Sequence, residues 1–213
     1  MKNHLVVTIS REVGSGGHTV GAKLAEKLGI RYCDKDLING LRAKFNLTES
    51  SIERLKGEKK HWMSDFAKWV TPIPRQNMFV SEGDAYVQEF RPDITTDDVF
   101  KAETEILKAI ADEEPCVIAG RSGFFVLKDC PEKVDIFITA PRASRIARVM
   151  RKQNLTEEQA AAVIDSVDKS RENYVRRYTG TSRYDARNYN LSINMDGLTE
   201  DDAVALILAY IKE

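Results

Sequence analysis

The stretch His4–Gly21, HLVVTISREVGSGGHTVG, decides the fold of this chain. Its apolar, β-branched run Leu5–Ile9 predicts a buried strand, and apolar residues at helical spacing over Val20–Leu28 predict a helix. The loop between them contains the glycine-rich segment Gly14–Gly17. Glycines let a backbone turn tightly and present consecutive N–H groups to an anion, and the helix that follows adds its unpaired donors and the positive end of its dipole. The stretch therefore predicts a strand, a phosphate-binding loop and a helix.

The loop matches the P-loop pattern G-x-x-x-x-G-K-[ST] only in part. In the segment Glu12–Thr19, Gly17 and Thr19 are in register, but Glu12 replaces the first glycine and His18 replaces the lysine. An ordinary glycine-rich turn between a strand and a helix is the alternative. From the loop alone, the two interpretations are equally supported.

Two residues are candidates for the missing positive charge. A lysine in this pattern is a permanent cation, whereas an unperturbed histidine side chain has a pKa near ~6.5 and is only partly charged at neutral pH. Bound phosphates would favour the charged form of His18. Arg11, immediately before the loop, is the other candidate, and its alternative role is a surface salt bridge with a residue such as Glu12.

Composition and charge bound the classes of function. A chain of 213 residues with 42% hydrophobic residues is long enough for one domain with a sizeable core. Its 32 basic and 33 acidic residues give a net charge of -1, which argues against DNA, RNA or an anionic membrane as a general partner. The start MKNHLVV enters a strand without a signal-peptide pattern, so we expect a cytoplasmic protein. Free thiols are expected for the three cysteines, Cys33, Cys116 and Cys130.

Strand and helix patterns alternate along most of the chain. Further strands are predicted at Ile30–Cys33, from Pro115 to Gly120-Arg121, at Val134–Thr139 and at Tyr189–Asn194. Helices are predicted at Leu37–Phe45, Thr96–Glu114 (with Thr96 or Asp97 as N-cap), Arg142–Lys152, Thr156–Tyr178 and from Thr199. This alternation implies a parallel sheet with right-handed crossovers. Residues 46–95 are less regular and predict an inserted lobe, in which Trp62 and Trp69 pack on one helix face.

Three groups of charged residues, one after a predicted strand and two on predicted helices, each have two interpretations. Asp34 and Asp36 follow a strand at the sheet edge where α/β proteins bind ligands, but either one could instead cap the next helix. The basic helix Arg142–Lys152 could face a ligand or only solvent. Likewise, the charges between Asp165 and Arg171 could form no more than a solvated helix face with i,i+3 pairs.

Four stretches together resemble a known family. The segment Gly120–Ala140 is similar to the Gly-Arg-Asp segment and following strand of the cytidylate kinase branch of the nucleoside monophosphate kinases. The lid motif of that branch resembles Asp165-x-x-Asp168-x-x-Arg171, and its closing strand and helix resemble Tyr189–Ile211. The loop SREVGSGG, together with Asn173–Thr179, NYVRRYT, is more similar still to the cytidylate kinase-like group. Several motifs in the family's order favour phosphate binding over a structural turn.

The resemblance implies an α/β fold, the P-loop NTPase three-layer α/β/α arrangement with a parallel central sheet. It divides the single domain into a core of about residues 1–35, 96–150 and 185–213, an acceptor-binding insertion of about 36–95 and a lid of about 151–184. The insertion and the lid are expected to move, because closure both assembles the site and excludes water.

The resemblance also implies roles for individual residues. The donor ATP would be held by Gly14, Ser15, Gly16, Gly17, His18 and Thr19, with Arg148 and Arg151 above it, and the Thr19 hydroxyl would help to position Mg²⁺. The acceptor would be bound by Asp34, Arg42, Arg121, Asp168 and Arg171. The cations expected to act on the transferred group are His18, Arg11, Arg121 and Arg171.

The sequence thus leads to two hypotheses. The first is a kinase that uses ATP and Mg²⁺ to phosphorylate a nucleoside monophosphate, cytidylate or a related small phosphate acceptor. Ser122 stands where the resembled kinases carry an aspartate, so the cytosine preference is not carried over. The alternative is a nucleotide-binding sensor that keeps the fold but has lost catalysis along with the lysine. Both take small-molecule nucleotides as partners.

Overall fold

The computed structural model describes residues 4–33 and 95–212. The helix predicted at Leu37–Phe45, the inserted lobe and the candidate ligands Asp34 and Arg42 lie outside the described residues. All structural statements below concern the described part of the chain.

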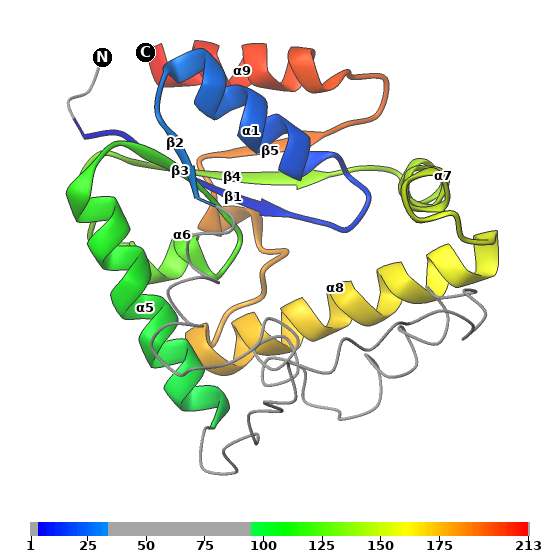
Figure 1. Cartoon of the computed structure of the whole chain (residues 1–213), viewed down its shortest axis with the longest axis horizontal. Coiled ribbons are helices and arrows are strands. Elements are labelled where there is room, and N and C mark those ends of the chain that lie inside the picture. The colour runs from blue at the N-terminus through cyan, green and yellow to red at the C-terminus, as the bar shows by residue number, and fades with distance from the viewer. Residues whose placement is uncertain (1–3, 34–94, 213) are drawn as a thin grey trace, which may run out of the picture.

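The described strands form one parallel sheet in the order β2-β3-β1-β4-β5 (Figure 1). Their bounds are Val6–Arg11 (β1), Arg31–Cys33 (β2), Cys116–Ala119 (β3), Lys133–Thr139 (β4) and Leu191–Asn194 (β5). β1 is central: Val6 pairs with Cys116 of β3 on one side and with Lys133 of β4 on the other. The parallel sheet predicted from the alternating pattern is confirmed, and its middle strand leads directly into the glycine-rich loop.

Helices cover both faces of this sheet. Their bounds are Gly17–Leu28 (α1), Thr96–Glu113 (α5), Gly123–Val126 (α6), Arg142–Gln153 (α7), Glu157–Thr179 (α8) and Glu200–Lys212 (α9), with a short 3₁₀ turn at Ala186–Asn188. α1 and α9 lie on one face, and α5, α6 and α8 lie on the other, while α7 sits beyond the carboxyl ends of β1 and β4 (Figure 1). The fold is therefore the predicted three-layer α/β/α arrangement.

Side chains of β1 point alternately into the two layers. Val7 and Ile9 are fully buried among the residues of α1 and α9, whereas Val6 belongs to the cluster on the side of α5 and α6. A strand covered on both faces reads as a continuous apolar run, which is why Leu5–Ile9 predicts a buried strand. Each such side chain contributes about 1.5–3 kcal/mol on burial, so the strand that carries the loop is firmly held.

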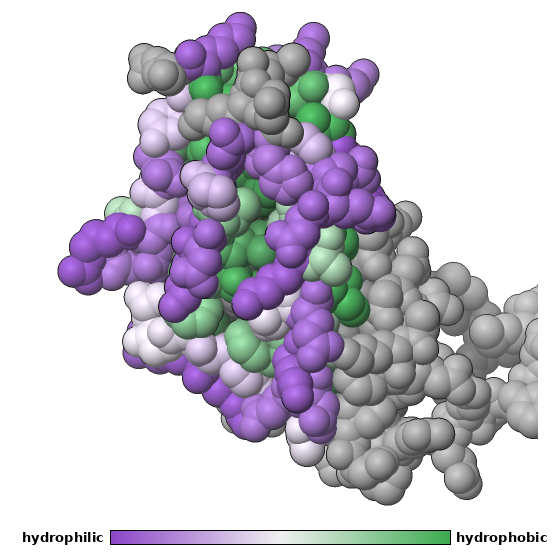
Figure 2. All heavy atoms as spheres, turned by 90° about the vertical axis from the view of Figure 1, so that its left-hand side faces the viewer, coloured by the Kyte–Doolittle hydropathy of each residue, from purple (hydrophilic) through white to green (hydrophobic). Residues whose placement is uncertain are grey.

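The outer surface and the cysteines add few constraints on function. Viewed from the side opposite α7, hydrophilic side chains border the apolar surface that remains visible (Figure 2). None of the described helices combines the length and the apolar character needed to cross a membrane. Cys33, Cys116 and Cys130 are free thiols, as predicted.

The N-cap of α5 differs from the prediction. Thr95, rather than Thr96 or Asp97, caps the helix: its hydroxyl accepts a hydrogen bond from the Asp98 N–H, and the Asp98 carboxylate accepts one from the Thr95 N–H at 2.9 Å. This reciprocal pair is a capping box, which needs a carboxylate three residues after the cap. The choice therefore depends on Asp98, whose pKa the hydrogen bonds from Thr95 hold below its usual value.

Replacing the observed cap gives a direct test. Thr95→Ala removes the hydroxyl from the capping box and should lower the free energy of unfolding by about 1 kcal/mol. Thr96→Ala, one residue along, should change it less, since Thr96 already lies inside the helix. Urea denaturation of both variants checks this, and equal losses would show that the cap is wrongly assigned.

Candidate active site

The glycine-rich loop leaves the carboxyl end of β1 and ends at the first turn of α1. Gly14 has a φ of 80°, and a Cβ there would lie 2.6 Å from the backbone oxygen of Arg145. Gly16 has a φ of 90°, and a Cβ there would lie 3.0 Å from Nη1 of Arg148. Both positions therefore need glycine, because backbone conformation and close contact each disfavour a side chain. The Ser15 hydroxyl, which donates to the carbonyl of Glu12 at 2.9 Å, closes the loop.

A hollow of about 250 Å³ lies over this loop. It is lined by the loop glycines Gly14, Gly16 and Gly17 together with His18, Thr19, Arg148 and Lys152, among others. Most of the residues predicted to bind ATP thus line one hollow. Two do not: Ser15 is fully buried within the loop, and Arg151 is exposed on α7 outside the lining. Arg148 is held beside Gly16 by a hydrogen bond to Glu200 at the start of α9.

A second hollow, of about 180 Å³, adjoins the first. Its lining includes Arg121, Ser122, Arg183, Glu103 and Tyr174. Arg11 and Arg171 line both hollows. We call the space over the loop the loop hollow and the second space the arginine hollow.

Arg11 reaches from β1 to the end of β3. A Cβ at Gly17 would lie 2.6 Å from the Cβ of Arg11, and a Cβ at Gly120 would lie 2.1 Å from its Nη1. The side chain therefore passes between two positions where only glycine leaves room for it. The backbone oxygen of Arg11 accepts hydrogen bonds from Arg171 and Arg183.

The arginine hollow is crowded with positive charge. Burial and the nearby guanidiniums of Arg11 and Arg183 lower the pKa of Arg171 from its ordinary value, and the Asp168 carboxylate opposes this shift. Guanidiniums gathered in this way repel one another, and an anion placed among them would relieve the repulsion. Planar guanidinium groups also match the oxygens of a phosphate. The hollow is therefore suited to a phosphorylated ligand.

A buried carboxylate lies in the same hollow. Glu103 of α5 is almost fully buried, accepts a hydrogen bond from the Tyr174 hydroxyl at 2.6 Å and lies 3.6 Å from Nη1 of Arg121. Burial and the Glu103 charge raise the pKa of Tyr174 well above its usual range, so its hydroxyl stays a donor. Glu103 thus orients Arg121, which has a left-handed φ of 59° just after β3.

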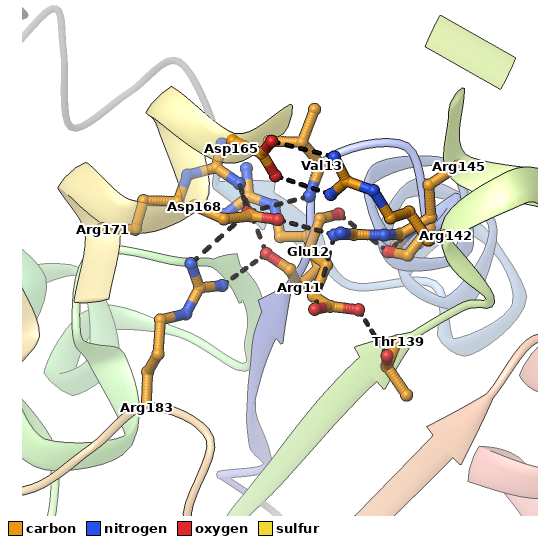
Figure 3. Close-up of polar contacts among 12 residues, drawn as sticks. Arg11, Glu12, Val13, Thr139, Arg142, Arg145, Asp165, Asp168, Arg171 and Arg183 are labelled. Carbon is orange, nitrogen blue, oxygen red and sulfur yellow. Dashed lines mark hydrogen bonds and ion pairs between the residues drawn. The ribbon is translucent and has the colours of Figure 1, made fainter. Parts of the chain in front are cut away.

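Asp168 of α8 ties the loop to two helices (Figure 3). One carboxylate oxygen accepts the Val13 N–H at 3.1 Å and lies 3.7–3.8 Å from Arg183 and Arg171, while the other accepts from Arg145 of α7 at 2.6 Å. Burial raises the pKa of Asp168, and the Val13 N–H and the arginines oppose that shift. Because both oxygens act as acceptors, the geometry fits an ionised carboxylate.

The charges of α8 thus form more than a solvated helix face, because the Asp168 side chain is only 9% exposed. Asp168 is not among the residues that line the loop hollow or the arginine hollow. The expected contact of Asp168 with an acceptor sugar stays a prediction. In the structure, this carboxylate serves the loop and its flanking arginines.

Glu12, which replaces the first glycine of the P-loop pattern, has a carboxylate that is paired within the protein. Its carboxylate accepts a hydrogen bond from the Thr139 hydroxyl at the end of β4 and lies 3.4 Å from Nη1 of Arg145. The negative charge is therefore balanced by Arg145 (Figure 3). This pairing reduces the repulsion that Glu12 would exert on a bound phosphate.

Sequence reasoning missed three functional neighbours: Arg145, Arg183 and Glu103. Arg145 precedes Arg148 by three residues, a spacing that places both on one face of α7 and could have indicated their shared direction. Glu103 lies four residues after Val99 and four before Leu107, on the apolar face of α5. Arg183 follows α8 in an irregular segment, where no periodic signal was present.

Comparison of the sequence with known proteins identifies the family of this chain. The model of the cytidylate kinase-like family matches residues 6–197. The chain belongs to the cytidylate kinase-like family. It is 26% identical over 211 residues to the cytidylate kinase of Pyrococcus horikoshii, covering 99% of this chain and 90% of that protein. With the cytidylate kinase of Sulfolobus acidocaldarius, identity is 23% over 206 residues, covering 96% of this chain and 93% of that protein.

Solved structures share the fold of this cytidylate kinase-like chain. An uncharacterized protein from Eubacterium ventriosum superposes with a TM-score of 0.68 at 24% identity, covering 98% of this chain and 99% of that one. A gluconokinase from Sinorhizobium meliloti has a TM-score of 0.55 at 16% identity, with 100% and 94% covered. The P-loop kinase fold is shown by these likenesses, and family membership supports a kinase of nucleotides or other small molecules.

The chemistry expected of Mg²⁺ fits the loop of this cytidylate kinase-like protein. Among residues 4–33 and 95–212, no group of three or more histidines, cysteines or carboxylates is placed to hold a metal ion. Mg²⁺ in kinases keeps several waters and is bound by few protein groups together with substrate phosphates. Thr19 lines the loop hollow, and its hydroxyl is an oxygen ligand of the kind that such an ion accepts.

Two aspartates of α8 provide a matched test of the anchor. Asp165 and Asp168 each pair with an arginine of α7, but the Asp165 side chain is 61% exposed and the Asp168 side chain 9%. Asp168→Ala should lower the free energy of unfolding by about 3–5 kcal/mol, because the buried Arg145 loses its hydrogen-bonded carboxylate and keeps, among the described residues, only Glu12, 3.4 Å away. Asp165→Ala should cost at most about 1 kcal/mol. Chemical denaturation measures both, and comparable losses would contradict the anchoring role.

Proposed function

We propose that this protein transfers the γ-phosphoryl group of ATP to a nucleoside monophosphate, with cytidylate the first candidate, or to a related small phosphate acceptor. One observation carries the proposal: the loop hollow and the arginine hollow adjoin, and Arg11 and Arg171 line both. A phosphoryl-transfer enzyme must hold donor and acceptor in line and neutralise charge where they meet. Two adjoining anion sites with shared cations are suited to that task.

The donor would occupy the loop hollow. Backbone N–H groups of the glycine-rich loop and the first turn of α1 would hold its phosphates, and Arg148 would lie above them. Mg²⁺ bound with ATP supplies positive charge between the phosphates, and the Thr19 hydroxyl would help to hold it.

The acceptor would occupy the arginine hollow. Arg121, oriented by Glu103, would grip the acceptor's phosphate, and Arg171 would contact it on the side of the loop. Arg11 would stand between the acceptor phosphate and the transferred group, where negative charge is shared by attacking and leaving oxygens. It would therefore supply the permanent charge that His18 does not.

Turnover of nucleotides tests the proposal. The purified full chain, given ATP and Mg²⁺ with CMP, dCMP, UMP, AMP or GMP in turn, should form a diphosphate from at least one of them in a coupled ADP-release assay. Arg121→Ala should reduce kcat/KM for that acceptor by about 100-fold, since a bidentate phosphate contact is lost.

The exposed basic residue Lys108 of α5 provides a control, because it lines neither hollow. Lys108→Ala should keep the activity of the unchanged protein. If ATP binds but no acceptor is turned over, the proposed kinase activity on these acceptors fails, and the nucleotide-binding sensor becomes the better description. Recovery of turnover in His18→Lys would then attribute the loss to the missing lysine.

The shared position of Arg11 leads to a second prediction. Arg11→Ala should lower kcat by about 10²–10³-fold with little change in melting temperature, because a positioned donor to the transferred group is lost. His18→Ala should lower kcat by less than about 5-fold, since the His18 ring is exposed and packs edge-on against Tyr32 at 5.6 Å between centroids. Steady-state kinetics of both variants at saturating ATP measures this, and a larger loss in His18→Ala would reverse the assignment.

A further inference from the structure

Arg183 has a buried position that the proposed function does not yet use. It lies in the irregular segment between α8 and β5, is 4% exposed and lines the arginine hollow. A charged side chain is rarely buried to this degree without partners that hold it there. The contacts of its backbone and of its guanidinium therefore need to be considered separately.

The backbone of Arg183 is fixed on both sides. Its N–H donates to the Glu172 carboxylate of α8 at 3.0 Å, and its carbonyl accepts from the Tyr189 hydroxyl at 2.7 Å. Nearby, the Asn188 side-chain amide donates to the carbonyl of Ser182 at 2.8 Å. The side chain is thus aimed before any ligand arrives, which lowers the entropy cost of binding.

The two terminal nitrogens of this guanidinium differ. Nη2 donates to the backbone oxygen of Arg11. Nη1 is buried, lies 3.7 Å from the nearer Asp168 oxygen and makes no hydrogen bond with any described residue. Buried N–H donors are almost always hydrogen-bonded, so this one, in a residue that lines a hollow, is a candidate donor to a ligand atom.

A second residue that lines the arginine hollow also has a buried polar atom without a hydrogen bond to any described residue. Ser122, directly after Arg121, is 5% exposed, and its hydroxyl oxygen makes no hydrogen bond within the described part of the chain. Its backbone has a left-handed φ of 54°, which serine adopts only at a cost. Ser122 and Arg183 come from distant parts of the chain, yet both line the arginine hollow.

We propose that Arg183 is an acceptor-binding residue, whose Nη1 donates to an anionic oxygen of the acceptor's phosphate while the Ser122 hydroxyl bonds a polar group on the rest of that molecule. The hollow then selects a small molecule that carries both a phosphate and a hydrogen-bonding ring or sugar. Naming this molecule a nucleoside monophosphate rests on the proposed function, but the binding of its phosphate by Arg183 does not.

Binding, rather than turnover, tests this inference. The full chain is first saturated with a non-hydrolysable ATP analogue and Mg²⁺, so that the loop hollow is filled, and is then titrated calorimetrically with inorganic phosphate and, separately, with CMP. Arg183→Gln should weaken phosphate binding by about 10–100-fold, the loss expected for a charge-assisted hydrogen bond, and leave the affinity for the analogue within about 3-fold. Ser122→Ala should weaken CMP binding and leave phosphate binding unchanged.

Arg187 provides the matched control, since it belongs to the same segment, is paired with Asp185 and has a side chain that is 89% exposed. Arg187→Gln should bind phosphate like the unchanged protein. If Arg183→Gln fails to fold, Arg183→Lys keeps a cation with a different hydrogen-bonding geometry and should still weaken phosphate binding by about 3-fold or more.

The outcomes separate this inference from the proposed function. Equal phosphate affinity in Arg183→Gln and the unchanged protein, or no phosphate binding by the unchanged protein, overturns the inference even if the protein is an active kinase. Parallel losses of phosphate affinity, analogue affinity and melting temperature would show a merely structural role and overturn it as well. A selective loss of phosphate affinity supports it even if none of the tested nucleotides is phosphorylated.

Discussion

The arrangement of the candidate site depends on the buried carboxylate of Asp168. This one group accepts the Val13 N–H of the loop and the guanidinium of Arg145, and it lies within 4 Å of Arg171 and Arg183. Burying a charge is costly unless it is paired and hydrogen-bonded. The loop, α7 and α8 therefore share one electrostatic requirement, and the position of each depends on the others.

That constraint explains how a loop without the usual lysine can still be surrounded by positive charge. Arg145 balances the charge of Glu12, while Arg171 and Arg183 donate hydrogen bonds to the backbone oxygen of Arg11. The Arg11 side chain can then extend between two glycines toward both hollows. Positive charge reaches the junction from the strand before the loop, rather than from the helix after it. The function proposed for Arg11 follows from this position of its charge at the end of β1.

The buried polar groups of the arginine hollow hold its arginine side chains in fixed orientations. Glu103 and Tyr174 orient Arg121, and the segment after α8 aims Arg183. Groups held in this way need no reorganisation when an anion binds, which is the condition under which electrostatic stabilisation is most effective. Because this order comes from hydrogen bonds between distant elements, its loss should affect ligand binding before it affects the sheet.

The sequence by itself determined the sheet, the glycine-rich loop and the family. The sheet and the loop are local features, given by apolar runs that alternate with helical spacing and by glycines in the loop. The family followed from the resemblance of several motifs in the family's order. It also named Arg121 and Arg171, which stand in motifs, and Arg148, which stands in a basic helix, as candidate ligand-binding residues. The N-cap of α5 was misplaced by one residue, since two threonines and two aspartates compete there and only the backbone geometry chooses.

Only the tertiary structure decided which charges meet. The partners of Asp168 come from positions 13, 145, 171 and 183, and no sequence spacing relates them. The same holds for Glu103, whose helical position predicts burial but not its pairing with Tyr174 and Arg121. Periodicity reports which face of an element is buried, whereas ion pairs form between elements whose packing brings their side chains together. The sequence therefore identified a phosphate-binding fold, and the packing of α7 and α8 on that fold determined how its charges are arranged.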